Sequence, residues 1–239
     1  MSQQATFLTA IRENPEDDTA RLAYADWFSE RGQPGDAEYA ELIRLQCTLA
    51  RVPSDDVPAE PLLRRETELL DLFGPTLRAN VEAVPGVKVD WNVTGLPDLI
   101  RSARDSIPDV RVMGCLDRGF VASAVVDLNR WEGAIAERMK ELFANGPIRS
   151  LRLEGHFHER LRAFLDCPEL TCVSRLYLGT YAFRSQQISA EGIWLVASCP
   201  HLCNLRSLNL GYRPVNGRLV GRGNLRVFFT WKETLDGRA

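Results

Sequence analysis

The second half of the chain repeats a short pattern, and this repeat limits the possible folds more than any single residue does. The segments IRSLRLEG (148–155), VSRLYLGT (173–180) and LRSLNLGY (205–212) each carry two leucines separated by one residue and followed closely by glycine. Their first leucines, Leu151, Leu176 and Leu208, lie 25 and 32 residues apart. A Cys-Pro pair begins nine residues before each of the last two leucines. Such recurrence predicts stacked structural repeats.

Each repeat predicts one strand and one helix. The paired leucines alternate with polar residues as in a strand with one buried face. The segments WEGAIAERMKELFANGP, HERLRAFLDCP and SAEGIWLVASCP predict helices that end before Pro147, Pro168 and Pro200. A strand and helix recurring at this distance are typical of leucine-rich repeats, which stack into a curved solenoid lined by a parallel sheet. AVVDL (124–128) aligns as a degenerate first repeat, with Val126 matched to Leu151.

The first 75 residues predict four helices. FLTAIREN ends at Asn14-Pro15, and the acidic residues 16–18 supply capping oxygens to a second helix that runs to about Arg31. A third helix covers AEYAELIRLQCTLARV, and a fourth, LLRRETELLDLFG, is expected to end at Gly74-Pro75. The predicted fold is therefore α/β: a short leucine-rich-repeat solenoid, with parallel strands and outer helices, preceded by a small all-α module.

Four segments follow from these patterns. Residues 1–75 form the helical module, and 76–120 form a connecting or capping segment with short strands and a turn at Asp117-Arg118-Gly119. Residues 121–212 form the solenoid. Residues 213–239 are irregular and read equally as a capping strand or a frayed end.

Composition excludes several classes of function. The formal charge of -3 arises from 29 basic and 32 acidic residues mixed along the chain, so no cationic field exists to bind nucleic acid. The sequence contains no run of eighteen apolar residues and no export signal, which predicts a cytoplasmic protein without a membrane partner. Six cysteines are too few for a disulfide framework.

Two groups of residues raise the question of a metal or catalytic site. Four cysteines have a spacing that superficially suits zinc: Cys167, Cys172, Cys199 and Cys203. Cys167 and Cys199 occupy equivalent repeat positions, however, which favours buried packing. The trio His156, His158 and Glu159 suits a metal or acid–base site but also a solvated turn. The chain contains no nucleophile, metalloprotease, phosphate-loop or dinucleotide motif. No catalytic residue, metal or cofactor is therefore predicted.

The predicted binding surface is the concave face of the sheet. The residue between the paired leucines points away from the core, which gives one row of four side chains: Asp127, Arg152, Tyr177 and Asn209. The neighbouring row holds Val125, Ser150, Arg175 and Ser207. Arginine and tyrosine are common binding anchors, and four strands make a strip about 15 Å across, which suits a peptide. The alternative is a merely solvated sheet face.

Two parts of the chain resemble a known family. FLTAIRENPEDDTARLAYADWFSERGQPGDAEYAELIRLQ is similar to the repeat-companion domain, an amino-terminal module abundant in planctomycete bacteria and usually followed by leucine-rich repeats. The likeness is close over residues 5–50 and looser over 118–212, including RGFVASAVVDL. The resemblance implies an architecture and no catalytic residue set. The matching residues are Phe7, Leu8, Ile11, Asn14, Pro15, Asp18, Arg21, Leu22, Tyr24, Ala25, Asp26, Trp27, Glu30, Arg31, Gly32, Glu41, Ile43, Arg44, Leu45 and Gln46.

Asp26 is the most conspicuous charge in the helical module. Because Leu22, Ala25 and Trp27 surround it, we expect a half-buried carboxylate that requires a partner. Arg44 of the third helix is the predicted partner, in a structural ion pair that joins the two helices.

The predicted function is a non-catalytic interaction scaffold that binds a protein or peptide segment on the concave face. The alternatives are an enzyme with an unrecognised site and a degenerate paralogue with no specific partner. The sequence does not identify the partner or the oligomeric state.

Overall fold

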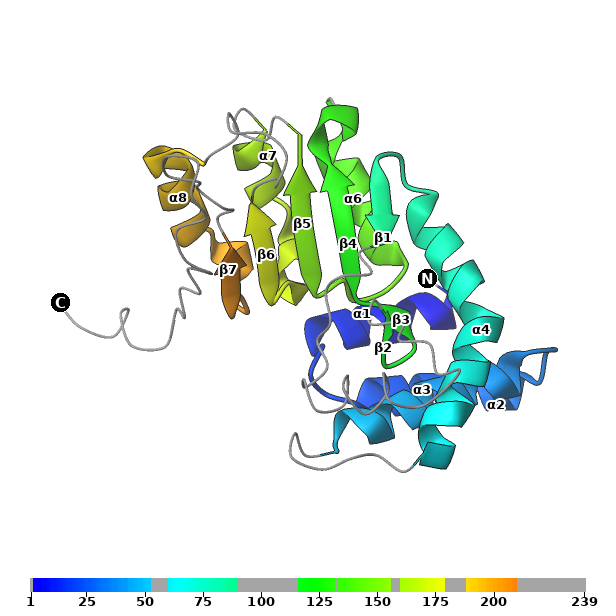
Figure 1. The fold of residues 1–239 in the computed structure, drawn as a ribbon. Coiled ribbons are helices and arrows are strands. Elements are labelled where there is room, and N and C mark those ends of the chain that lie inside the picture. The colour runs from blue at the N-terminus through cyan, green and yellow to red at the C-terminus, as the bar shows by residue number, and fades with distance from the viewer. Residues whose placement is uncertain are drawn as a thin grey trace, which may run out of the picture. The chain divides into compact units, whose positions relative to one another are not determined.

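A computed structural model describes residues 2–52, 60–89, 116–131, 133–155, 160–178 and 188–209 (Figure 1). These residues form a mixed α/β protein with seven α-helices and a mostly parallel sheet. They divide into two compact units. The first takes the described residues of 1–83, 89–123 and 144–147, and the second takes those of 84–88, 124–143 and 148–239.

Four helices build the first unit: α1 (Gln3–Glu13), α2 (Thr19–Arg31), α3 (Asp36–Ala50) and α4 (Glu60–Glu82). The start of α1 is fixed by the Ser2 hydroxyl, which accepts a hydrogen bond from the Ala5 amide. Helix α2 ends at Gly32, whose left-handed φ of 66° is the usual conformation after a helix. The three predicted helices up to residue 50 are confirmed.

Helix α4 does not end at Gly74-Pro75 as predicted, but continues to Glu82 with Pro75 inside it. An internal proline removes one backbone hydrogen bond and costs about 3 kcal/mol. Buried residues lie on both sides of it, with Leu69 and Leu70 before and Val81 after. Tertiary burial on both sides of the proline outweighs its local preference.

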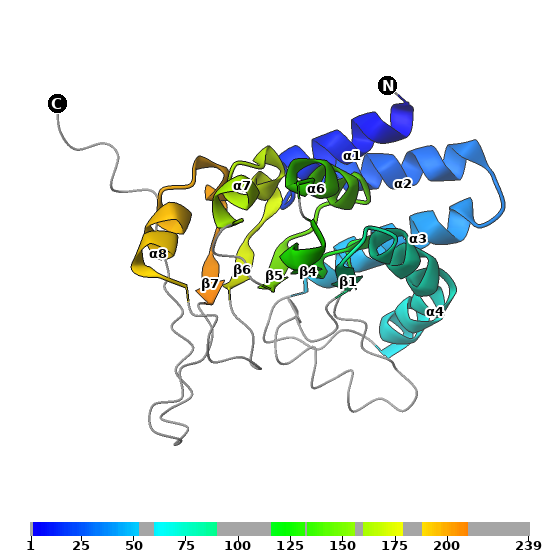
Figure 2. The same ribbon diagram turned by 90° about the horizontal axis from the view of Figure 1, so that it is seen from above.

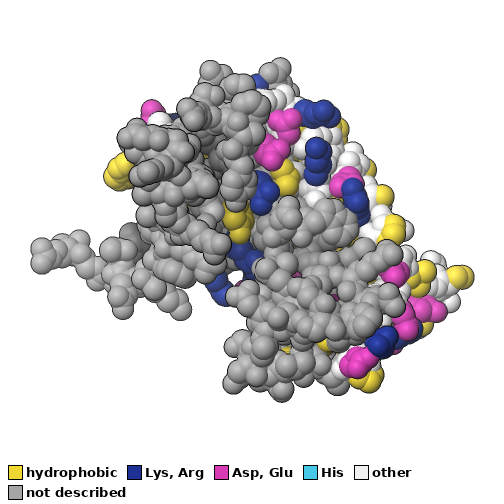
Figure 3. All heavy atoms as spheres, viewed as in Figure 1, with side chains coloured by type: hydrophobic (Ala, Val, Ile, Leu, Met, Phe, Trp, Pro, Cys, Tyr) yellow, Lys and Arg dark blue, Asp and Glu magenta, His cyan; other side chains and the backbone are white. Residues whose placement is uncertain are grey.

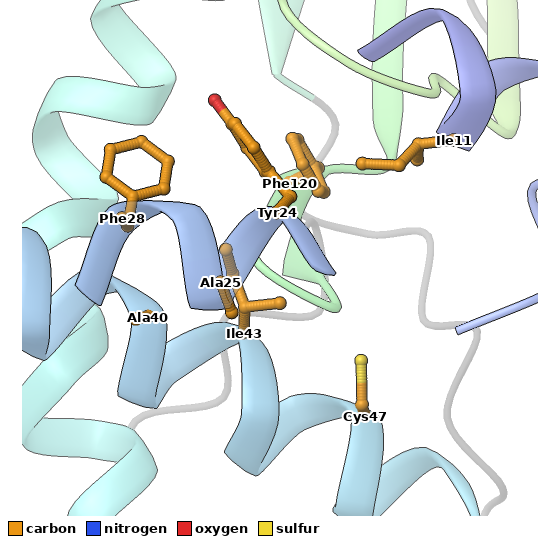
Figure 4. Packing of buried hydrophobic residues seen from close by; sticks show 8 residues of the cluster. All are labelled: Ile11, Tyr24, Ala25, Phe28, Ala40, Ile43, Cys47 and Phe120. Carbon is orange, nitrogen blue, oxygen red and sulfur yellow. The ribbon is translucent and has the colours of Figure 1, made fainter. Parts of the chain in front are cut away.

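The core of the first unit gathers side chains from three helices and one hairpin (Figure 4). The hairpin pairs β2 (Leu116–Asp117) with β3 (Phe120–Val121) in antiparallel register, so Arg118 and Gly119 form its turn. The predicted turn at this position is confirmed. The buried cluster consists of Ile11, Tyr24, Ala25, Phe28, Ala40, Ile43, Cys47 and Phe120.

The second unit is built on a five-stranded sheet in the order β1-β4-β5-β6-β7. Its strands are β1 (Val87–Val89), β4 (Ser123–Asp127), β5 (Ser150–Glu154), β6 (Arg175–Leu178) and β7 (Ser207–Asn209). Strands β5, β6 and β7 are parallel, and Leu151 pairs with Leu176, which pairs with Leu208. The register predicted from the repeat is confirmed for these three strands.

Helices follow the strands, as the repeats predict. They are η1 (Leu128–Trp131), α6 (Ile135–Ala144), α7 (Leu161–Leu165), η2 (Pro168–Cys172), α8 (Ala190–Ala197) and η3 (Pro200–Leu202). Helices α6 and α7 lie against one face of the sheet (Figures 1 and 2). The two Cys-Pro-x-Leu segments have the same local structure, since each cysteine is extended, each proline begins a 3-10 turn, and Leu170 and Leu202 are fully buried.

Candidate functional site

The outward side chains of β5, β6 and β7 form two rows across the sheet. Strand register places Arg152 beside Tyr177 and Tyr177 beside Asn209. These three side chains are partly exposed, whereas the leucines that alternate with them are buried. The register therefore brings together three of the four residues of the predicted row.

Arg152 and Tyr177 are held against each other. The guanidinium carbon of Arg152 lies 5.6 Å from the centre of the Tyr177 ring. A cation at this distance is attracted by the ring, and exposed pairs of this kind contribute about 0.5–1 kcal/mol. The contact limits the conformations of two residues with the chemistry of binding anchors, so less entropy is lost when a ligand orders them.

The second row runs through Ser150, Arg175 and Ser207, which are also in register. Sequence alternation predicted all three as surface positions. Arg175 and Ser207 are partly exposed, but Ser150 is only 3% exposed, and its hydroxyl has no hydrogen-bond partner in the described part of the chain. A buried hydroxyl without a partner is unfavourable, and such groups merit a functional explanation.

Acidic residues stand at the carboxyl ends of two strands. Asp127 ends β4 and Glu154 ends β5, and acidic side chains are visible over this end of the sheet in Figure 3. The Asp127 carboxylate accepts a hydrogen bond from the backbone amide of Asn129 at 3.0 Å, and it lies close to Gly155, just after β5. Asp127 therefore belongs to the acidic end of this face, while Arg152 and Arg175 supply its basic part.

The predicted ion pair between Asp26 and Arg44 is present in the first unit. Nη2 of Arg44 donates to Oδ1 of Asp26 at 2.7 Å and to the Ser29 hydroxyl at 3.0 Å, and so links α3 to α2. The expected half-burial is wrong, because the Asp26 side chain is 66% exposed and that of Arg44 is 40% exposed. Water screens such a pair, so it contributes little to stability.

We therefore expect Asp26→Ala to lower the free energy of unfolding by less than about 1 kcal/mol. Denaturant unfolding of the wild type, Asp26→Ala, Arg44→Ala and the double variant isolates the pair energy, which should decrease in high salt. A coupling of several kcal/mol would contradict this assignment.

The repeat cysteines are buried thiols that bond to backbone carbonyls. The Cys167 thiol donates to the Ala163 carbonyl at 3.4 Å, and the Cys199 thiol donates to the Leu165 carbonyl at 3.2 Å. Burial raises the pKa of Cys167 to about 12 and also raises the pKa of Cys199, which disfavours the thiolate that zinc requires. Within the described ranges, no three metal-ligating side chains cluster. His156, His158 and Glu159 lie outside the described residues.

The first unit contains a charged cluster that sequence reasoning missed. Asp18 was predicted to cap α2, but its side chain makes no capping bond and is 7% exposed. Its Oδ2 accepts a hydrogen bond from Arg51 Nε at 3.0 Å, and its Oδ1 lies 3.0 Å from Arg118 Nε. The nearest sequence signal was the acidic run before α2, which also fits an ordinary helix start. Asp17 provides the local bond, since its carboxylate accepts from the Thr19 amide at 2.9 Å.

Comparison with known proteins gives no relative from which to transfer a role. No protein-family model matches the chain, and neither the curated proteins nor the solved structures contain a match. No helix in the described ranges has the length and apolar character needed to cross a membrane. The case for a functional site therefore depends on the geometry of this chain.

Proposed function

We propose that the second unit is a short leucine-rich-repeat solenoid that acts as a non-catalytic interaction scaffold, with the first unit as its repeat-companion module. Three features support the solenoid. Leucines 25 and 32 residues apart pair in register, helices α7 and α8 occupy equivalent places, and both Cys-Pro pairs begin the same 3-10 turn. Neighbouring repeats of this kind bury a continuous column of leucines that one repeat cannot bury alone.

The ligand of this scaffold is an acidic peptide or protein segment bound on the outward face of β5, β6 and β7. The observation that carries the proposal is the grouping of Arg152, Arg175 and Tyr177 in two adjacent, registered rows. Arginine guanidinium groups bind carboxylates through directional, charge-assisted hydrogen bonds.

The dimensions of the surface favour an extended segment. Neighbouring strands lie about 4.8 Å apart, so three strands give a strip about 10 Å wide between the outer strand axes. A strip of this width accommodates one extended chain and is much smaller than a standard protein–protein interface. The acidic residues Asp127 and Glu154 at one end of the face set the polarity of the ligand, because they repel its carboxylates toward the arginines.

The direct test is selection from two displayed libraries of extended peptides that differ only in the sign of their charged positions. We expect the full chain to enrich peptides from the Asp/Glu library and none from the Lys/Arg library. The double variant Arg152→Glu with Tyr177→Ala should weaken the selected peptides by at least about tenfold without loss of helical signal, because it removes both anchors and reverses one charge. Binding should also weaken as salt rises.

Arg162→Glu is the matched control. Arg162 is an exposed arginine of α7, which lies on the opposite side of the sheet (Figure 2). The control makes the same charge change without touching the proposed surface, so binding should persist. Equal losses in the two variants, or enrichment of basic peptides, would refute the proposed surface.

A further inference from the structure

The turn of the hairpin β2–β3 is inserted among the helices of the first unit. Strand register leaves two residues, Arg118 and Gly119, in the turn, and their φ angles are 50° and 86°. Two central residues with positive φ define the type I′ turn of tight hairpins. Asparagine and glycine are the usual residues there, so an arginine in this conformation calls for an explanation from its side chain.

The Arg118 side chain provides that explanation. It is 13% exposed, and its Nε lies 3.0 Å from Oδ1 of Asp18, whose own side chain is 7% exposed. Glu16 lies at 4.0 Å from the same guanidinium. Asp18, the residue just before α2, therefore receives the positive charge of the turn in a largely water-excluded place, while Glu16 is 44% exposed. A buried ion pair stabilises the fold only while both partners are present, because either charge alone is unfavourable away from water.

The backbone of Gly119 is bound at both of its polar atoms. Its amide donates to Oε1 of Gln46 at 2.7 Å, and its carbonyl accepts from the Tyr39 hydroxyl at 2.9 Å. Gln46 is oriented for this role because its Nε2 donates to Glu66 of α4 at 2.9 Å. Desolvation raises the pKa of Tyr39, so its hydroxyl remains a donor.

The same site excludes any side chain on Gly119. A Cβ atom built there would lie 2.4 Å from Cγ1 of Ile43, closer than carbon atoms can approach. The next residue, Phe120, is 2% exposed and stacks on Tyr24, with ring centres 6.0 Å apart and planes 14° apart (Figure 4). The helical unit thus contacts the charge of Arg118, the backbone amide and carbonyl of Gly119, the space beside its Cα atom, and the ring of Phe120.

We propose that the helical unit contains a binding site for a type I′ turn with the sequence Arg-Gly-Phe, and that in this protein its ligand is the hairpin of the same chain. The contacts come from Asp18 before α2, from Tyr24 on α2, and from Tyr39, Ile43 and Gln46 on α3. This binding site is separate from the sheet face, and its test does not depend on the function proposed for that face.

The test uses the full chain and a fluorescent, backbone-cyclised hairpin peptide that carries Leu-Asp-Arg-Gly-Phe-Val across its turn. In the wild type the site is filled, so binding of the peptide should be weak. In Gly119→Ala the native turn no longer fits beside Ile43, and the peptide should bind at least about tenfold more tightly, because the vacant state becomes more populated. A control peptide with alanine in place of its glycine should bind neither protein.

A measurement on the wild type covers the case in which Gly119→Ala fails to fold. The Gly119 amide is buried on Gln46, so its hydrogen exchange reports opening of the site. Peptide that captures the open site should accelerate this exchange by a factor that grows linearly with peptide concentration, and the control peptide should not. Unchanged Gly119 exchange, or equal binding of both peptides to folded Gly119→Ala, would overturn the proposal.

Discussion

Replacing Asp18 with alanine is expected to lower the free energy of unfolding of the helical unit by about 1–3 kcal/mol, because the largely buried guanidinium of Arg118 loses its nearest carboxylate. Two more exposed carboxylates remain near it, Asp117 at 3.4 Å and Glu16 at 4.0 Å. The side chain of Arg118 is 13% exposed and loses the carboxylate at 3.0 Å from its Nε. Arg51 loses its partner in the same step, although at 63% exposure it can be solvated by water. The fully buried Arg21 adds positive charge to the same region, since Arg21 and Arg118 both lower the pKa of Cys47 while burial and Asp18 raise it.

Asp26→Ala is a close control for this experiment. Both variants remove one carboxylate paired with an arginine in the same unit, and they differ in burial, with side-chain exposures of 7% for Asp18 and 66% for Asp26. Denaturant-dependent hydrogen exchange at amides of α2 and α3 measures the stability of this unit separately from the other. Comparable losses in the two variants would show that burial of the Asp18 cluster does not determine its contribution.

Replacing Trp131 with alanine should destabilise the second unit by about 3–5 kcal/mol. The side chain is fully buried, and its indole Nε1 donates to the Pro85 carbonyl at 2.5 Å, which ties η1 to the turn before β1. Alanine removes the largest fully buried side chain among the described residues and leaves a cavity as well as an unpaired carbonyl.

Trp131→Phe separates the two contributions. Phenylalanine retains most of the ring volume but cannot donate to Pro85, so its cost should be about 1–3 kcal/mol. Exchange protection of amides in β4 and β5 measures both variants. A loss in the alanine variant no larger than in the phenylalanine variant would show that packing around Trp131 contributes little.

The repeated part of the fold was readable from sequence because one spacing encodes it. The paired leucines and the Cys-Pro offset predict which residues pair across strands, and the register of Leu151, Leu176 and Leu208 agrees with them. The number of residues between successive repeats can be read directly from the sequence, without knowledge of which distant residues are in contact. The path of α4 through Pro75 was not readable in this way, because tertiary burial on both sides of the proline decides it.

The burial of the acidic residues in the helical unit was predicted less well. Leu22 and Trp27 suggested that the face of α2 carrying Asp26 points inward. The buried residues of this helix are instead Arg21, Tyr24, Ala25 and Phe28. That set has helical spacing and includes an arginine, so hydrophobicity alone selects the wrong face. The Asp18–Arg118 contact joins residues one hundred positions apart, and no local pattern in a single sequence indicates it.

The sequence also predicted only part of the candidate binding face. Alternation along each strand predicted the outward positions of Arg152, Tyr177 and Asn209, and strand register places them side by side. The stacking of Arg152 on Tyr177 and the buried hydroxyl of Ser150 depend on side-chain conformations and on surrounding chain. These details exceed what a period-two pattern can specify.

The unequal spacing of the repeats has a consequence for how such a chain can diversify. Leu151 to Leu176 spans 25 residues and Leu176 to Leu208 spans 32, yet both pairs are in register, and the nine-residue step from Cys-Pro to leucine is constant. The additional length therefore falls between β6 and Cys199, where α8 has eight residues and α7, its counterpart, has five. This interval accepts insertions without shifting the leucine column, which makes it a suitable position for grafting foreign loops and for rapid divergence among related chains.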